Sequence, residues 1–182
     1  MKCTNLELSG LKLIELDLHG DDRGFFVERF HVNKFQELEI PNKIFQINHS
    51  RSGPNVLRGL HFQINPNQGK LIGVVRGKIW DVAVDIRKDS PTYGQSYGVE
   101  LTDTNGKLLW VPAGFAHGFC TLGEGLTDVL YYVDAAYTPI NEGGILWDDP
   151  DLNIHWPVKE PATSERDQNL SSWENFESPF KV

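Results

Sequence analysis

The chain has 182 residues, of which 40% are hydrophobic and 11% aromatic, and a net charge of −8. These values are typical of a globular protein and exclude a disordered one. The acidic balance argues against a nucleic-acid partner, because such binding depends on a basic face. No apolar run approaches the ~20 residues of a spanning helix, so we expect no membrane association. The segment from Met1 to Glu7 lacks the apolar core of a secretory signal, which predicts a cytoplasmic protein, and the length fits one domain over 1–182.

Short apolar segments separated by glycine, proline, asparagine and aspartate recur along the chain, and few stretches have a helical period. The expected strands are Lys12–Leu18, Phe25–Phe30, Ile44–Asn48, Val56–Phe62, Leu71–Val75, Ile79–Ile86, Gln95–Leu101, Leu108–Val111, His117–Leu122 and Asp128–Val133. Many short strands joined by turns are typical of an all-β sandwich or barrel. Two short helices are also expected, one at Asn33–Glu39 and one that begins at Ser164.

The strand expected at Ile79–Ile86 separates its side chains onto two faces. Alternation puts Ile79, Asp81, Ala83 and Asp85 on one face, and Trp80, Val82, Val84 and Ile86 on the other. One of these faces is therefore expected in the core, and the other is expected to be wet or functional.

Six histidines occur, and a lone histidine is usually structural, held by hydrogen bonds. We apply that interpretation to His19, His31, His49 and His155. His61 and His117 differ because each lies in an apolar segment punctuated by glycine. The two-residue period of a strand puts His61 on one face with Gly59 and Gln63, and places Arg58, Leu60 and Phe62 on the opposite face.

Two of these segments resemble the paired motifs of the cupins, in which histidines on barrel strands bind a metal ion. The second motif is intact as Pro112-x-Gly114-x-x-His117. The first is altered, since His61-x-Gln63 replaces His-x-His and Lys70 follows where a carboxylate ligand would be expected. An ammonium group repels a metal ion, so we predict a pocket without metal or other cofactor. The alternative is a metallo-cupin oxygenase that uses only His61 and His117.

A closer resemblance covers the chain from about Leu11 to about Asp167. Eight segments carry it: Asp21–Glu28, Phe45–Ser50, Val56–Gln63, Gln68–Leu71, Asp81–Gly94, Val111–Phe119, Glu142–Pro150 and Ser164–Asp167. In order and spacing they are similar to the dTDP-4-dehydrorhamnose 3,5-epimerase family of dTDP-L-rhamnose synthesis. The resemblance implies a cupin-type jelly roll with a few short peripheral helices. It also implies a homodimer and a nucleotide-sugar substrate, a dTDP-4-keto-6-deoxyhexose.

The chemistry of that family requires a base on one face of the sugar, an acid on the other, and a group that stabilises the enolate oxygen. The resemblance implies that His61 is the base and that Asp167 orients it. Tyr131 would be the proton donor, and Lys70 would stabilise the enolate. From the residues alone, Asp167 could instead complete a helix cap with Ser164. Tyr131 and Tyr132 must face opposite sides of their strand, so only one of them can face the barrel interior.

The resemblance also implies a set of residues that bind the nucleotide sugar. They are Arg23, Glu28, Gln46, Asn48, Arg58, His117, Tyr137, Glu142 and Arg166. Arginine suits a pyrophosphate because a planar guanidinium donates two parallel hydrogen bonds. The alternative for Arg23 and Glu28 is a surface ion pair.

Two departures from the family pattern bear on which nucleotide sugar the protein accepts. Gly73 replaces an arginine that often follows the Lys-Leu pair, which we expect to remove a cation near the anion site. The segment Glu124-Gly125-Leu126 also differs, which could alter the sugar pocket. A relative that inverts only C3 or only C5, or that acts on another nucleotide sugar, is the nearest alternative. A non-catalytic sugar-binding cupin is the alternative from another class.

Overall fold

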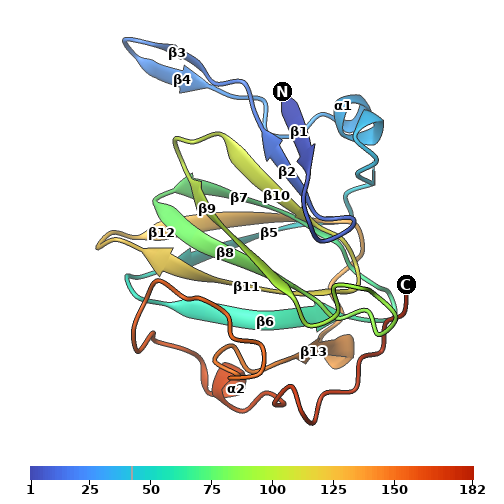
Figure 1. The fold of residues 1–182 in the computed structure, drawn as a ribbon. Coiled ribbons are helices and arrows are strands. Elements are labelled where there is room, and N and C mark those ends of the chain that lie inside the picture. Colours follow the sequence, from blue (N-terminus) through green and yellow to red (C-terminus); the bar gives the residue numbers. More distant parts are fainter. Residues whose placement is uncertain (42) are drawn as a thin grey trace.

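The computed structural model describes residues 1–41 and 43–182, and two antiparallel sheets stacked on each other dominate it (Figure 1). The six-stranded sheet has the order β1 (Lys2–Asn5), β2 (Lys12–Glu15), β10 (Lys107–Val111), β7 (Lys70–Arg76), β12 (Thr127–Val133) and β5 (Gln46–Ser52). The five-stranded sheet has the order β13 (Glu142–Gly144), β6 (Leu57–Gln63), β11 (Phe115–Leu122), β8 (Lys78–Asp85) and β9 (Ser96–Thr102). This is the jelly roll that the sequence predicted.

Three smaller elements lie outside the two sheets. A hairpin of β3 (His19–Asp21) and β4 (Gly24–Phe26) projects from the body of the molecule (Figure 1). The helices are α1 (Val32–Glu37), the 3-10 turn η1 (Pro139–Asn141) and α2 (Glu165–Gln168), so both expected helices are present. No helix in the described part of the chain is long and apolar enough to cross a membrane.

Several strand bounds differ from the expectation. The strand expected at Phe25–Phe30 ends at Phe26, because Val27 and Phe30 pack against the cluster around Phe35 of α1. The strands β1, β3 and β13 were not predicted. Their sequences are polar or glycine-rich, and ladder hydrogen bonds to a neighbouring strand hold them in place.

The core lies between the sheets, and a second apolar cluster covers the outside of the five-stranded sheet. On β8, Ile79 and Ala83 belong to the inner cluster, whereas Val82 and Val84 belong to the outer one. The outer cluster is closed by the chain after β13, through the side chains Leu152, Trp156, Trp173, Phe176 and Phe180. That segment runs along the outside of β6 (Figure 1). Both faces of this strand are buried, so neither is wet, and of the expected wet or functional face only the functional alternative is left.

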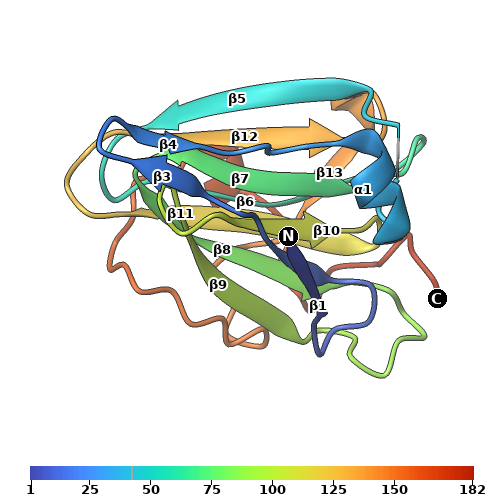
Figure 2. The ribbon, with the colours of Figure 1, turned by 90° about the horizontal axis from the view of Figure 1, so that it is seen from above.

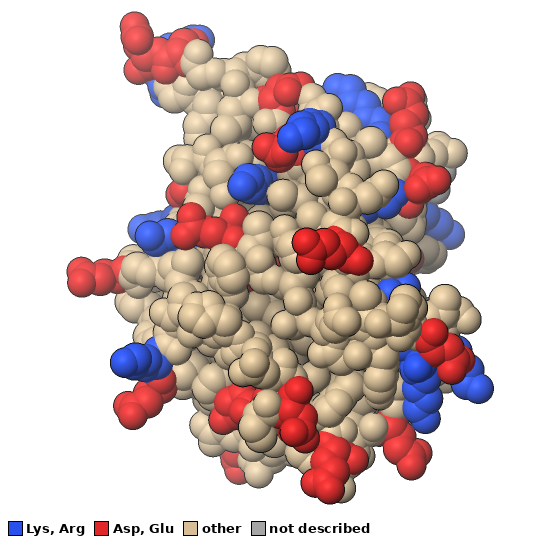
Figure 3. Space-filling model, in the orientation of Figure 1, with Lys and Arg blue, Asp and Glu red and all other residues tan. Residues whose placement is uncertain are grey.

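The segment from β3 to α1 lies over the outer face of the six-stranded sheet when the molecule is seen from above (Figure 2). Its anchor is Phe35, which is buried against Leu71, Leu108 and Trp110 of β7 and β10. On the face drawn in Figure 3, basic and acidic side chains are interspersed over the surface. The six-stranded sheet is thus covered on its outer side at α1, while its inner side faces the core and the pocket.

Candidate active site

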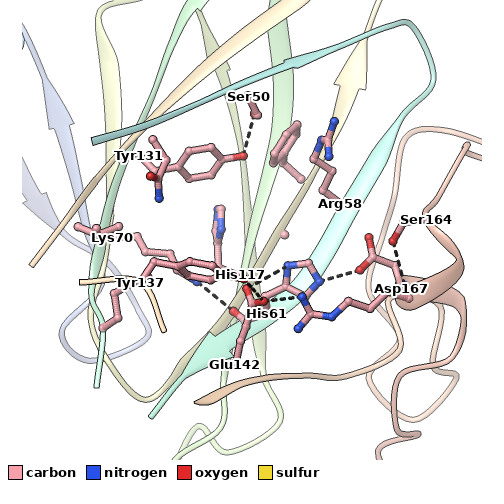
Figure 4. Close-up of a pocket in the computed structure, with 16 residues that line it drawn as sticks. Ser50, Arg58, His61, Lys70, His117, Tyr131, Tyr137, Glu142, Ser164 and Asp167 are labelled. Atoms are coloured by element: carbon pink, nitrogen blue, oxygen red, sulfur yellow. Dashed lines mark hydrogen bonds and ion pairs between the residues drawn. The ribbon is translucent and has the colours of Figure 1, made fainter. Parts of the chain in front are cut away.

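A cavity of about 360 Å³ opens between the two sheets, and side chains from both sheets and from α2 line it (Figure 4). The lining includes all four residues predicted to act in catalysis, namely His61, Lys70, Tyr131 and Asp167. It also includes six of the predicted binding residues, namely Asn48, Arg58, His117, Tyr137, Glu142 and Arg166. Residues up to 119 positions apart in the sequence therefore meet in one pocket, although their roles stay predictions.

One histidine–carboxylate pair in the pocket joins β6 to α2. His61 Nε2 lies 2.7 Å from Asp167 Oδ1, and Asp167 is buried. Burial raises the pKa of this carboxyl group, but the hydrogen bond and charge of His61 outweigh it and leave the pKa below its usual value. The backbone N–H of Asp167 donates to Ser164 Oγ, which caps α2. Ser164 therefore caps α2 through the backbone of Asp167, while the carboxylate of Asp167 binds His61 rather than completing a capping box.

A β-bulge brings Arg58 to the pocket beside His61, contrary to the expectation that they face opposite sides. His61 pairs with His117 and Arg58 pairs with Phe119, so two residues of β6 oppose Gly118 alone. The extra residue turns the side chain of Arg58 inward. Gly59 permits this close approach, because a Cβ atom there would lie 2.6 Å from the Cα of Gly118.

The two tyrosines of β12 face opposite sides, as strand alternation predicted. Tyr131 packs against the inner core cluster and lies edge-on to His117, with ring centroids 6.3 Å apart. Tyr132 stacks on Phe30 at the outer face of the sheet. The hydroxyl group of Tyr131 is 3.1 Å from Ser50 Oγ, and burial raises the pKa of Tyr131. The phenol that enters the pocket is therefore Tyr131.

Lys70 enters the pocket from the start of β7. Its ammonium group donates to the carbonyl oxygen of His61 at 3.2 Å. Burial lowers the pKa of Lys70 to about 8, and the charges of Glu142 and Asp81 partly oppose that effect. The group is therefore a cation that loses its proton just above neutral pH.

A second histidine–carboxylate pair lies deeper. His117 Nε2 is 2.8 Å from Asp81 Oδ1, and Asp81 is wholly buried. Asp81 Oδ2 has no hydrogen-bond partner among the described residues, and burial raises the pKa of this carboxyl group despite His117. The sequence interpretation missed Asp81 as a site residue. The available signal was a carboxylate between Ile79 and Ala83, on a strand face that is otherwise apolar up to Asp85.

The mouth of the pocket is a network centred on Glu142. Tyr137 Oη donates to Glu142 Oε2 at 3.0 Å, and Arg166 Nη1 donates to the same oxygen. Glu142 Oε1 lies 4.0 Å from His61 Nδ1, the ring nitrogen that Asp167 leaves free. Gln46 does not line the cavity, but it accepts from the backbone N–H of Tyr137 and donates to Asn48.

Two predicted binding residues do not reach this pocket. Arg23 lies on the exposed β3–β4 hairpin and pairs with Asp21. Glu28 is exposed as well and pairs with Lys34. Each takes part in a surface ion pair, as the alternative interpretation held, but they do not pair with one another.

The two departures from the family pattern also lie away from the pocket, so their expected effects were wrong for this chain. Gly73 is on the outer face of β7, and a Cβ atom there would clash with Leu108. An arginine at this position would therefore not point at the anion site. The segment Glu124–Leu126 belongs to a separate surface hollow with Gly77 and Thr102.

A jelly-roll barrel whose cavity holds a histidine–carboxylate pair, an ammonium group and a phenol is built like an acid–base enzyme. Comparison with known proteins identifies the family. A family model described as dTDP-4-dehydrorhamnose 3,5-epimerase matches residues 5–175. The chain therefore belongs to the dTDP-4-dehydrorhamnose 3,5-epimerase family, whose members are isomerases.

Relatives and solved structures support this assignment over nearly the whole chain. A dTDP-4-dehydrorhamnose 3,5-epimerase from Shigella flexneri is 45% identical over 172 residues, covering 93% of this chain and 94% of the relative. A dTDP-6-deoxy-D-glucose-3,5-epimerase from Legionella pneumophila, solved with dTDP-4-keto-L-rhamnose, superimposes with a TM-score of 0.94 at 40% identity. It covers 100% of this chain and 98% of its own. A dTDP-4-dehydrorhamnose 3-epimerase from Streptomyces niveus is 37% identical, covering 93% of this chain and 82% of the relative.

Proposed function

We propose that this protein converts dTDP-4-dehydro-6-deoxy-D-glucose into dTDP-4-dehydro-L-rhamnose by inverting C3 and C5. The observation that carries the proposal is the arrangement of His61 and Tyr131. They enter one cavity from opposite sheets, with Lys70 in the same cavity (Figure 4). A planar enolate held between them can lose a proton on one face and gain a proton on the other.

In the proposed reaction, His61 Nδ1 takes a proton from a carbon beside the C4 ketone. Asp167 favours the imidazolium that forms and fixes the tautomer that leaves Nδ1 free, because it binds Nε2 at 2.7 Å. The electron pair of the broken C–H bond moves onto the ketone oxygen, where the ammonium group of Lys70 stabilises the negative charge. Tyr131 then delivers its hydroxyl proton to the other face of the same carbon, which inverts it.

The proposed chemistry uses no metal, and the polar side chains around His61 support this. Gln63 stands where a cupin has its second histidine, and its amide donates to the carbonyl oxygens of Pro66 and Ala136. His117 is engaged by Asp81, and the cationic Lys70 lies within 3.2 Å of the His61 backbone. In the ranges 1–41 and 43–182 no three His, Cys, Asp or Glu side chains converge as metal ligands. A cation beside two already bonded side chains disfavours a metal ion.

We also propose that two copies form a dimer, in which the hairpin of one copy supplies Arg23 and Glu28 to the pocket of the other. The exposed apolar side chains support this: Phe25 and Phe26 of the hairpin are 49% and 70% exposed. Ile47, on the edge strand β5, is 58% exposed. Such surfaces are usually covered by a partner.

Shared sites make a sharp test of the dimer. Arg23→Ala and His61→Ala should each be weakly active alone. Mixed and re-equilibrated, they should regain activity, because one of the two sites in a mixed dimer has neither defect. A monomer by light scattering, or no recovery on mixing, would contradict the dimer proposal.

The epimerase activity itself is tested by incubating the protein with dTDP-4-dehydro-6-deoxy-D-glucose in heavy water. Deuterium and inverted configuration are expected at both C3 and C5 by NMR. Deuterium at one carbon alone would identify a single-carbon epimerase instead. No exchange at either carbon would favour a binding protein that has lost the reaction.

A further inference from the structure

Ser50 is a pocket residue that the sequence interpretation did not assign. It lies on β5, where the side chains of Asn48, Ser50 and Ser52 share the inward face. Asn48 is directly opposite Tyr131, and Ser50 is the next inward residue along the strand. Its hydroxyl oxygen is 3.1 Å from the hydroxyl oxygen of Tyr131 (Figure 4). Within the described residues, this is the one hydrogen bond that the phenol makes.

The polar side chains of this strand have separate partners. Asn48 accepts from Gln46 at 2.6 Å, and Ser52 accepts from Arg58 at 3.0 Å. Ser50 alone is bonded to the phenol, and it lines the cavity and is only partly buried. It therefore touches both the phenol and the open cavity.

Inversion of two carbons creates a need that inversion of one does not. After the first inversion, Tyr131 has lost its proton and His61 carries one. The phenolate is unfavourable here because burial raises the pKa of Tyr131. The proton on His61 is on the wrong face of the sugar to return to Tyr131. Tyr131 must therefore recover a proton while the sugar still fills the pocket.

We propose that Ser50 is the proton relay that recharges Tyr131 between the two inversions, an inference that rests on the proposed function. Ser50 passes its hydroxyl proton to the phenolate oxygen of Tyr131 and takes a proton from a water molecule, which leaves hydroxide. The imidazolium of His61 releases its proton to water. The two released species combine to water, and both side chains return to their starting states.

The test follows both inversions in a single turnover, with enzyme in excess over substrate and NMR detection of each carbon. In Ser50→Ala the first inversion should keep its wild-type rate within about twofold, because Tyr131 begins with its proton. The second inversion should slow by about tenfold or more, so that the singly inverted sugar accumulates. Ser50→Thr keeps the hydroxyl group and should restore the second inversion.

Three outcomes would overturn the relay. If Ser50→Ala slows both inversions by the same factor, the hydroxyl group only orients Tyr131. If neither inversion slows, water recharges the phenol directly. If the wild-type protein inverts a single carbon, the need for recharging disappears while the epimerase activity stands. A wild-type protein that exchanges no carbon contradicts the proposed function itself, which keeps the two failures distinct.

A measurement on the unaltered protein guards against a Ser50→Ala variant that does not fold. The rate of the second inversion is plotted against the deuterium fraction of the solvent. The relay moves two protons in one step, so the plot should curve. A straight line means that one proton moves, and it would also contradict the relay.

Discussion

Two histidine–carboxylate pairs lie side by side in this molecule, and their surroundings separate their chemistry. His61 and His117 are cross-strand partners on β6 and β11, and each bonds a carboxylate at 2.7–2.8 Å. The side chain of His61 is 23% exposed and its second nitrogen is free, whereas that of His117 is 4% exposed. The pKa of Asp167 lies below its usual value, but burial raises that of Asp81. A group that must take up and release protons has to be accessible to the substrate and to solvent. His61 is therefore suited to be the base, and His117 is suited to form part of the pocket wall.

The largest expected effect is the loss of the accessible histidine. His61→Ala should lower turnover by ~10²–10⁴-fold and stop deuterium uptake at every carbon, because it removes the proposed base. His117→Asn is the matched change in the buried pair. It should weaken substrate binding yet leave exchange detectable. Exchange that survives in His61→Ala and disappears in His117→Asn would reverse the assignment.

Next comes the acid on the opposite face. Tyr131→Phe keeps the ring but removes its hydroxyl proton, so the enolate should form and take its proton back from His61. Deuterium should then enter with retained configuration, and inversion should fall by about 10²-fold or more. Tyr132→Phe is the control, because its side chain packs outside the barrel against Phe30. Normal inversion by Tyr131→Phe would exclude it as the donor.

Variants that lack one or the other carboxylate should differ in turnover. Asp167→Asn should lower turnover by ~10²–10⁴-fold, because an amide does not stabilise the imidazolium of His61. Asp81→Asn should lower turnover by less than about tenfold, since Asp81 bonds His117, which forms the pocket wall and transfers no proton in the proposed reaction. Steady-state rates of the two variants measure this, and equal losses would contradict the separation of roles.

The same two carboxylates should have opposite effects on how the stability of the fold changes with pH. The folded pKa of Asp167 lies below 3.8, so its contribution is present above pH 3.8 and is lost as pH falls through the folded value. The folded pKa of Asp81 lies above 3.8, so stability is lost as pH rises from 3.8 through that value. Wild-type stability should therefore rise with pH relative to Asp167→Asn and fall relative to Asp81→Asn. Urea unfolding across the acid range checks both signs.

Lys70 lines the same pocket as His61 and His117 and gives a smaller, pH-dependent effect. With its pKa lowered to about 8, the ammonium form is lost as pH rises through that value, and kcat/KM should decline on that limb. Lys70→Arg keeps the charge and should move the decline to higher pH. An unchanged alkaline limb in that variant would assign the limb to another group.

The smallest expected effect is that of chelation. Dialysis against a chelator should leave turnover within about twofold, because Lys70 and the bonded Gln63 and His117 disfavour a metal ion. Loss of activity that one added metal ion restores would overturn the metal-free proposal. Metal analysis of the purified protein gives an independent check.

The sequence alone predicted the all-β architecture and most of the functional side chains that line the pocket. Alternating short strands predicted the two sheets, and the two-residue period separated Tyr131 from Tyr132. The altered cupin motif, with Gln63 and Lys70, predicted a pocket unsuited to metal. These features depend on local spacing, which a strand transmits directly to the direction of each side chain.

Only the tertiary structure decided the remaining features, because they depend on contacts between distant segments. The bulge opposite Gly118 turned Arg58 into the pocket, and packing against Phe35 ended the strand at Phe26. The C-terminal segment covered the outer face of β8, and the pairing of β8 with β11 in one sheet placed Asp81 beside His117. Arg23 lies outside the pocket of its own chain for the same reason. The spacing of residues along the chain does not indicate which surface a projecting hairpin contacts.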